Sequence, residues 1–125
     1  MTAISSSPIA EAISGKICLI TGGSRTLGAE IARRMARYGA QVVVNYHRSR
    51  EAALALCEEL AAFGGKAQAI QADVSQPGDV ERLVSETWTQ IGALDMVVNN
   101  VGPYADTPFL DLSLAEAEAA WKGAV

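Results

Sequence analysis

A turn built around two glycines is the first feature of the sequence whose spacing could do chemistry. Thr21-Gly22 ends a short apolar run, and after three more residues come Thr26 and then Gly28. The first glycine permits a tight turn, the second lets a helix pack closely on a sheet, and free amides at the helix start bind a pyrophosphate. An ordinary strand-to-helix turn explains the same residues equally well. The candidate phosphate-binding residues are Gly22, Gly23, Ser24, Arg25, Thr26, Leu27 and Gly28.

The end of the second apolar run carries basic rather than acidic side chains. Val42-Val43-Val44 is followed by Asn45 to Ser49, a stretch without a carboxylate. A carboxylate there would bind a ribose 2′-hydroxyl and repel a 2′-phosphate. Arg25 and Arg48 could clamp such a phosphate, because a guanidinium matches phosphate oxygens, although Arg48 could also simply solvate a helix start. These residues favour NADP(H), and we expect His47 to be an exposed neighbour of the clamp rather than a catalytic base.

Four apolar runs alternate with longer segments of helical periodicity. The runs predict strands at 16–21, 41–46, 66–71 and 94–98. The segments between them repeat apolar residues every three or four positions, which is typical of helices with one buried stripe. The expected stripes are Leu27, Ile31, Met35 and Tyr38, then Leu54, Cys57, Leu60 and Ala61, then Val80, Leu83, Val84, Thr87, Trp88 and Ile91. A capping-box pattern beginning at Ser113 predicts a last helix.

This alternation predicts an α/β fold. Parallel βαβ units with right-handed crossovers build a doubly wound, Rossmann-type sheet, here of strand order 3-2-1-4. In such a sheet a ligand binds where the strand order reverses, outside the carboxyl ends of strands 1 and 4. Thr21-Gly22 and Asn99-Asn100 stand at these two ends. The fold and the glycine turn therefore place the same residues beside a ligand.

Three motifs, each following an expected strand, resemble the signatures of the short-chain dehydrogenase/reductase family. The glycine turn is similar to the fingerprint Thr-Gly-x-x-x-Gly-x-Gly, Asp73-Val74 follows the third strand, and Asn99-Asn100-Val101-Gly102 is similar to Asn-Asn-Ala-Gly. The resemblance covers residues 15–125, and the chain resembles members of the family that are like 3-oxoacyl-carrier-protein reductase. It implies that Asp73 lies beside the adenine and that a basic residue at Arg25 goes with NADP(H). The further candidate cofactor residues are Asn45, Arg48, Asp73, Val74, Asn99, Asn100 and Gly102.

Two residues depart from the family pattern. Thr26 replaces the middle glycine of the turn, and Val101 replaces the alanine of the Asn-Asn-Ala-Gly motif. We expect Thr26 to adopt right-handed helical dihedrals, with its side chain where the backbone should approach the pyrophosphate. Its hydroxyl could donate to a phosphate, or its bulk could weaken binding. Val101 adds two methyl groups on the nicotinamide side, where overpacking costs about 1–3 kcal/mol.

The resemblance also implies catalytic residues that these 125 residues do not contain. The family uses a tyrosine as proton donor and a lysine four positions later, whereas none of Tyr38, Tyr46 and Tyr104 has a lysine at that spacing. Since family chains are about twice as long, we expect a domain truncated before a fifth strand, without the catalytic half or the helices that build the oligomer. We expect an NADP(H)-dependent carbonyl or alcohol oxidoreductase, with a small-molecule carbonyl substrate only in a full-length form. A non-catalytic dinucleotide-binding or interaction module and a broken gene product are the alternatives.

The composition defines the broad class of protein. A chain of 125 residues makes one domain, which we divide into a mobile tail, 1–14, and a partial Rossmann NADP(H)-binding domain, 15–125. A net charge of −4 argues against nucleic acid, because a phosphate backbone selects basic surfaces. The sequence shows no signal peptide and no apolar run near the ~18 residues of a membrane span, so we expect a cytoplasmic protein. Cys18 and Cys57 are expected to be buried and inert, Asp95 and Asp106 to be surface or loop residues, and no residues show metal-ligand spacing.

The fourth expected strand would form an uncovered edge of the sheet. It carries the apolar residues Leu94, Met96, Val97 and Val98. An apolar edge strand is an aggregation hazard, and a half-covered sheet offsets the ordering entropy of the chain poorly. We therefore expect marginal stability for the isolated chain.

Overall fold

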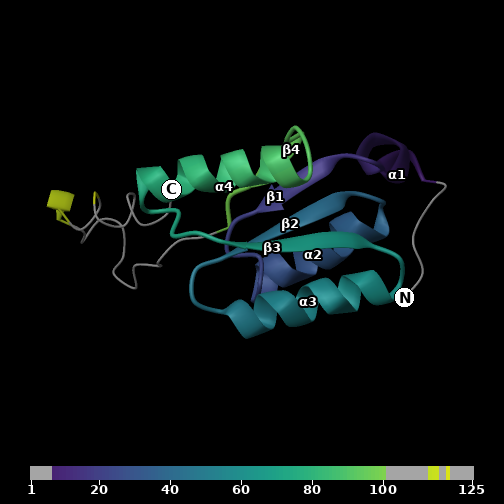
Figure 1. Cartoon of the computed structure of the whole chain (residues 1–125), viewed down its shortest axis with the longest axis horizontal. Helices are drawn as coiled ribbons and strands as arrows, with labels where there is room; N and C mark the ends of the chain where they lie inside the picture. Colours follow the sequence, from purple (N-terminus) through teal and green to yellow (C-terminus); the bar gives the residue numbers. More distant parts are fainter. Residues whose placement is uncertain (1–6, 101–112, 116–117, 119–125) are drawn as a thin grey trace.

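The computed structural model describes residues 7–100, 113–115 and 118. Helices and strands alternate in the expected order, and each strand lies within the apolar run that predicted it (Figure 1). The elements are α1 Pro8–Ile13, β1 Ile17–Ile20, α2 Thr26–Arg37, β2 Gln41–Tyr46, α3 Arg50–Ala62, β3 Lys66–Gln71, α4 Pro77–Gln90 and β4 Met96–Val98.

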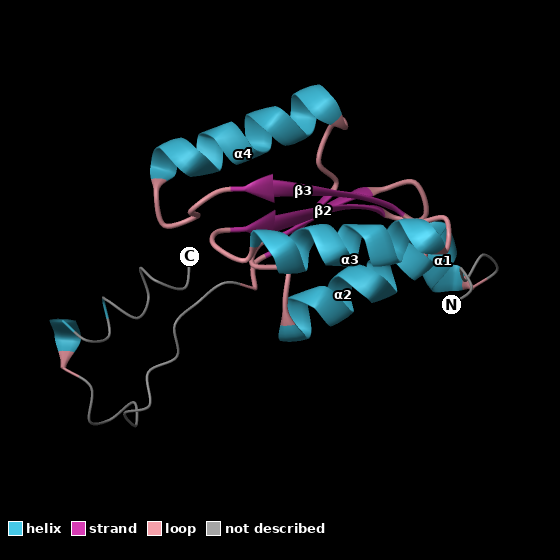
Figure 2. Ribbon diagram, turned by 60° about the horizontal axis from the view of Figure 1, so that its bottom comes forward, coloured by secondary structure: helices cyan, strands magenta, loops and turns pink. Residues whose placement is uncertain are grey.

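The sheet has the predicted doubly wound topology. All neighbouring strands run parallel, and their order is β3-β2-β1-β4. The helices α2 and α3 cover one face of the sheet, and α4 covers the other (Figure 2). Because the strands are parallel, their carboxyl ends meet at one edge of the sheet, where the order reverses between β1 and β4. This confirms the predicted Rossmann-type fold.

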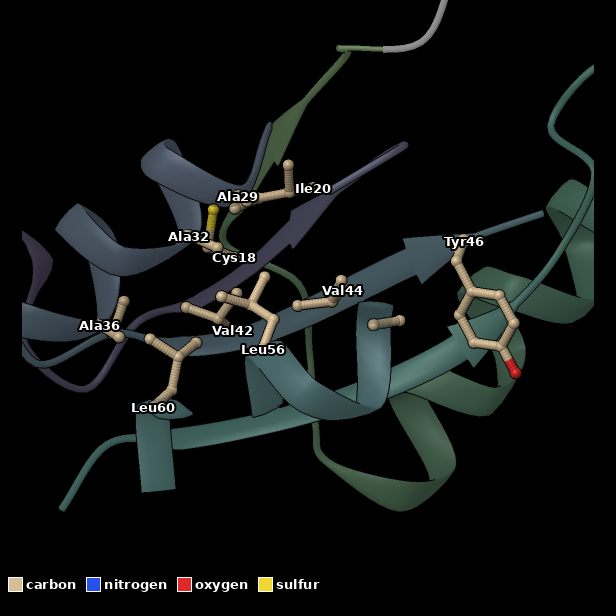
Figure 3. Packing of buried hydrophobic residues seen from close by; sticks show 12 residues of the cluster. Cys18, Ile20, Ala29, Ala32, Ala36, Val42, Val44, Tyr46, Leu56 and Leu60 are labelled. Atoms are coloured by element: carbon tan, nitrogen blue, oxygen red, sulfur yellow. The ribbon is translucent and has the colours of Figure 1, made fainter. Parts of the chain in front are cut away.

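The larger core lies between the sheet and the helices α2 and α3 (Figure 3). All four residues of β1 and five of the six residues of β2 are buried, since the helices cover both faces of these central strands. A continuous β-branched run such as Val42 to Val44 suits a strand covered on both sides. Small alanines on α2 let that helix approach Val42 and Val44 closely, while Val43 points to the other face. The central strands are therefore the most deeply buried part of the chain.

The predicted inner stripe of α2 is wrong by about one residue position. The buried residues of this helix are Gly28, Ala29, Ala32 and Ala36, whereas Leu27 is 62% exposed. Ile31 and Met35 pack against the margin of the core and not at its centre. Helical periodicity located two overlapping candidate faces, and the close approach at Gly28 selects the face with the smallest side chains.

The same correction applies to α3 and α4. In α3 the buried residues are Ala53, Leu56 and Leu60, while the predicted Leu54 and Ala61 are exposed. In α4 only Leu83 and Thr87 are buried, and the predicted Val80, Val84 and Trp88 are exposed. Trp88 is 64% exposed because α4 is the one described helix on its face of the sheet and meets the strands along a narrow strip.

The expected mobile tail contains a docked helix. Pro8–Ile13 forms α1, with Ser7 at its N-cap accepting a hydrogen bond from the amide of Ala10 at 3.0 Å. Ala10 is buried, and the Gly15 amide donates to the Gly39 carbonyl at 2.9 Å. A cap and a buried alanine thus hold α1 against the domain, while the mobility expected of the tail stays a prediction. Residues 1–6 lie outside the described part of the chain.

The helix predicted from Ser113 is only partly described. Leu114, Ala115 and Glu118 are helical, while most of the last helix predicted from Ser113 lies outside the described residues. Within the part that the structure describes, no helix combines the length and the apolar character that crossing a bilayer requires.

Candidate functional site

The glycine turn connects β1 to α2 at the carboxyl edge of the sheet. Gly22 has a φ of +58°, in the left-handed region that glycine adopts without steric penalty. A Cβ atom built on Gly28 would lie 2.6 Å from Nδ2 of Asn100 and 2.7 Å from the carbonyl oxygen of Gly22. Any larger residue at position 28 would push α2 away from the turn, so both predicted glycine roles agree with the geometry.

Hydrogen bonds join this turn to the end of β4 across the point where the strand order reverses. The hydroxyl of Thr21 accepts from the backbone amide of Asn100 at 3.0 Å. The backbone amide of Thr21 donates to the Val98 carbonyl at 3.0 Å. The side-chain amide of Asn100 donates to the Gly22 carbonyl at 3.1 Å. Asn100 is thus a structural clamp on the turn, and Asn99 beside it is exposed at the same edge.

Asn45 joins the turn to the second and third strands. Its Oδ1 accepts from the Gly22 amide at 3.2 Å, and its Nδ2 donates to the Ala72 carbonyl at 3.1 Å and the Ile70 carbonyl at 3.3 Å. The residue is 1% exposed, and its backbone carbonyl accepts from the Gly23 amide at 3.0 Å. A side chain so enclosed has no group free for a ligand. We therefore assign to Asn45 a role in positioning the turn, and its predicted contact with a cofactor stays a prediction.

The start of α2 keeps its amides open to the outside of the turn. Arg25 occupies the N-cap position without a side-chain cap hydrogen bond, although side chains at this position usually satisfy the first helical amides. The Gly22 and Gly23 amides are used by Asn45, so the groups available to a ligand are those of the residues that follow. Uncapped amides and the helix dipole together favour an anion at this place.

Thr26 does not have the backbone conformation predicted for it. Its φ is +47°, and among the described residues it alone combines a side chain with a positive φ. The sequence suggested right-handed helical dihedrals, and that expectation is wrong. The tight exit from Gly22 to Gly28 requires a left-handed residue at the first position of α2, which is a strained conformation for a β-branched side chain.

A second group of polar residues lies where β2 and β3 end. Nε2 of His47 is 3.7 Å from Oδ2 of Asp73, and Oδ1 of Asp73 accepts from the hydroxyl of Ser75 at 2.6 Å and from its amide at 3.0 Å. These Ser75 hydrogen bonds, and then the charges of His47 and Arg48, hold the pKa of the Asp73 carboxyl below its usual range. Asp73 is therefore ionised and fixed in orientation. Arg48 is exposed beside this group.

Three residues support this group through hydrogen bonds and were not predicted from the sequence: Gln71 of β3 and Asp79 and Arg82 of α4. Asp79 accepts from the Asp73 amide at 2.8 Å, which ties the loop to the first turn of α4. Gln71 donates to the His47 carbonyl at 3.2 Å, and Arg82 donates to the Gln71 carbonyl at 2.8 Å. An acidic residue in the first turn after Pro77 was the available signal for Asp79; no motif marks the other two.

Val74 and Asp95 were also singled out in the sequence, and both have structural contacts. Val74 packs against the smaller core, and Asp95 accepts from the Ile17 amide at 2.9 Å, which ties the loop before β4 to the start of β1. Among residues 7–100, 113–115 and 118, no group of three His, Cys, Asp or Glu side chains is placed to hold a metal ion. The residues Val101, Gly102, Tyr104 and Asp106 lie outside the described part of the chain.

Comparison with known proteins gives one consistent family. The family model described as short chain dehydrogenase matches residues 16–122. An uncharacterized oxidoreductase of Methylorubrum extorquens is 48% identical over 92 residues, and a 3-oxoacyl-[acyl-carrier-protein] reductase of Synechocystis sp. is 38% identical over 108 residues. Among solved structures, a blue fluorescent protein from a metagenomic library in complex with NADPH aligns with a TM-score of 0.76 at 38% identity.

These matches cover most of this chain but less than half of each relative. The alignment to the Methylorubrum protein spans 74% of this chain and 37% of that protein, and the alignment to the Synechocystis reductase spans 86% and 44%. The NADPH-bound structure is matched over 88% of this chain and 45% of its own. The shared part is therefore the sheet and helices that carry the site described above.

Proposed function

Because this chain belongs to the short-chain dehydrogenase/reductase family, we propose that it is the NADP(H)-binding part of an oxidoreductase acting on carbonyl or alcohol groups. One observation carries the proposal: the uncapped start of α2 lies at the same edge as Arg25 and Arg48, and no carboxylate ends β2. An open helix start suits a pyrophosphate, and basic side chains suit one more phosphate on the ribose.

The turn from Gly22 to Gly28 would hold the pyrophosphate. Gly28 leaves room for a close approach of helix and turn, because a Cβ there would meet Asn100 at 2.6 Å. Asn45 accepts from the amides of Gly22 and Gly23, so the pyrophosphate would bind to the amides from Ser24 onward. These residues fit the group in shape and in the sign of their charge.

The ends of β2 and β3 would hold the adenosine. Arg25 and Arg48 would bind the 2′-phosphate, and Asp73 with Val74 would border the adenine. At the other end of the cofactor, Asn99, Asn100 and Gly102 would border the nicotinamide, beside the junction of β1 and β4. NADPH in the aligned metagenomic structure supports the choice of cofactor class.

The chemistry of hydride transfer belongs to the nicotinamide when it is bound. The residues described here bind and orient it, and the 125 residues contain no Tyr-x-x-x-Lys pair to protonate a carbonyl. We therefore expect turnover of a small carbonyl compound only from a protein that spans the full length of the relatives.

A second candidate is a dinucleotide-binding module without catalysis, or an interaction module. The two candidates predict the same cofactor binding and differ in turnover, so a full-length protein that binds NADPH but reduces no carbonyl compound would support the module.

The test is a titration of the chain with NADPH and NADH, followed by ligand fluorescence and thermal unfolding. We expect NADPH to bind more tightly and to raise the melting temperature, since a ligand that binds only the folded state stabilises it. Arg48→Gln should reduce the preference for NADPH, while Lys66→Gln, which removes a cation from the other end of the parallel strands, should not. Equal affinity for both dinucleotides would contradict the assignment of Arg25 and Arg48.

A further inference from the structure

His47 is placed at the proposed adenosine site without a function assigned to it so far. It is the only histidine of the sequence, and its side chain is 47% exposed. Its backbone carbonyl is held by Gln71, which is held in turn by Arg82, so the position of the residue is defined while its imidazole remains open. A ligand at this edge can therefore meet the ring directly.

The charges around His47 are close to balanced without it. On its own loop stands Arg48; the loop after β3 contributes Asp73, whose Oδ2 lies 3.7 Å from Nε2 of the ring. From α4, Asp79 and Arg82 lie behind Asp73 and pair with one another at 3.7 Å. Because Arg82 also pairs with Glu86 at 3.2 Å, its charge is used within the helix.

The protonation of His47 would change this balance in favour of an anion. Histidine is the side chain that ordinarily changes charge between about pH 5 and pH 8. A neutral ring leaves the fixed carboxylate of Asp73 opposed mainly by Arg48, and that carboxylate repels a phosphate. A cationic ring compensates Asp73 and adds a donor at the same edge. Protonation of His47 thus makes the binding of a phosphate beside Asp73 more favourable.

We propose that protonated His47 selects a dinucleotide carrying a 2′-phosphate over one carrying a 2′-hydroxyl, so that the cofactor preference of this chain depends on pH. This inference rests on the proposed function. A partly exposed ion pair contributes about 0.2–1 kcal/mol, which predicts a change in preference of about 1.4- to fivefold. By linkage, binding of NADPH must favour the protonated ring to the same extent.

The test compares the wild-type chain with His47→Gln, which keeps a polar side chain of similar length but no titrating group. Dissociation constants for NADPH and NADH are measured at pH 6 and pH 8, and the wild-type preference is divided by that of His47→Gln at each pH. This division removes the titration of the 2′-phosphate itself, which occurs near pH 6. We expect the divided preference to be about 1.4- to fivefold larger at pH 6. Lys66→Gln, which removes a cation at the other end of β3, serves as a control and should retain the wild-type dependence.

The single imidazole signal in NMR spectra gives a second readout. Addition of NADPH should shift its titration midpoint upward, and addition of NADH should leave it in place. A pH dependence that His47→Gln retains, or an equal shift with both dinucleotides, would overturn the inference while leaving the proposed function intact. A folded wild-type chain that binds NADPH at neither pH would overturn the proposed function, and this inference with it.

Discussion

Thr26 is a β-branched residue held at a φ of +47° at the first position of α2. The left-handed region costs a side-chain-bearing residue about 1–2 kcal/mol, and glycine adopts it freely. Thr26 also stands where the family has glycine, so its side chain lies on the surface that a pyrophosphate would approach. Strain and access therefore change together at this one residue.

Replacing Thr26 with glycine should relieve both. We expect Thr26→Gly to raise the free energy of unfolding by about 0.5–1 kcal/mol, because the relieved strain exceeds the extra chain entropy of glycine. NADPH should bind more tightly as well. Chemical denaturation and NADPH titration check the two effects, and Thr26→Ala, which keeps Cβ, should give neither; equal gains from both variants would show that strain is not the cause.

Asn45 is the polar residue on which three strand ends depend. In Asn45→Asp, a carboxylate oxygen would replace Nδ2 and face the carbonyl oxygens of Ile70 and Ala72 in a buried position. We expect a loss of about 3 kcal/mol or more in the free energy of unfolding, since a buried charge loses hydration and gains no donor. Asn99→Asp makes the same change at an exposed position and should be close to neutral, as denaturant titration will show.

Cys18 is buried and Cys57 is partly buried, and this lowers the reactivity of both thiols. Desolvation raises the pKa of the Cys18 thiol from 9.0 to about 11, and it also raises the pKa of the Cys57 thiol. Because the thiolate is the reactive form, we expect both to react slowly with a thiol reagent at pH 8 in the folded chain and rapidly in denaturant. The raised pKa of Cys18 means that the unfolded thiol ionises first, so stability falls as pH rises from 9 toward 11. The fall should be smaller in Cys18→Ala, measured by the pH dependence of unfolding; identical slopes would contradict this account.

At the scale of elements, β4 is the strand with the least cover. Within residues 7–100, 113–115 and 118 it pairs only with β1, and Val97 is 53% exposed. Such an edge offers unpaired backbone groups and an apolar surface to another chain.

A lysine on this edge should oppose association of the chain with itself. We expect Val97→Lys to lower the aggregated fraction at high protein concentration, as followed by light scattering, because edge charges resist strand pairing. The control is Leu54→Lys, which removes an exposed apolar residue from α3, away from the edge. If both variants reduced scattering equally, general hydrophobicity and not the β4 edge would be responsible.

At the scale of the whole molecule, the two faces of the sheet are covered unequally. The face under α2 and α3 carries a core of twelve buried residues, and the face under α4 carries one of six. We expect backbone amides of β1 and β2 to exchange with deuterium most slowly and those of β4 and α4 to exchange faster, because local stability follows the number of buried apolar contacts. Hydrogen exchange with mass spectrometry would check this order, and equal protection of β2 and β4 would contradict it.

The sequence by itself determined the architecture of this protein. Strands alternating with amphipathic helices allow few topologies, since right-handed crossovers leave a parallel, doubly wound sheet as the consistent solution. Glycine at 22 and 28 marked the turn, because glycine adopts a positive φ without strain at position 22 and leaves room for the close helix approach at position 28. The motifs after β3 and β4 indicated the family, because each lies at the carboxyl end of a strand, where ligands bind in such sheets.

Only the tertiary structure decided how individual side chains are used. Helical periodicity could not tell the stripe of Leu27 from that of Ala29, since both repeat correctly and packing selects the smaller one. Asn45 looked like a ligand residue from its position, and three strand ends converge to bury it. The φ of Thr26 likewise depends on the distance that the turn must close. Each of these outcomes depends on contacts between segments distant in sequence, which local patterns do not contain.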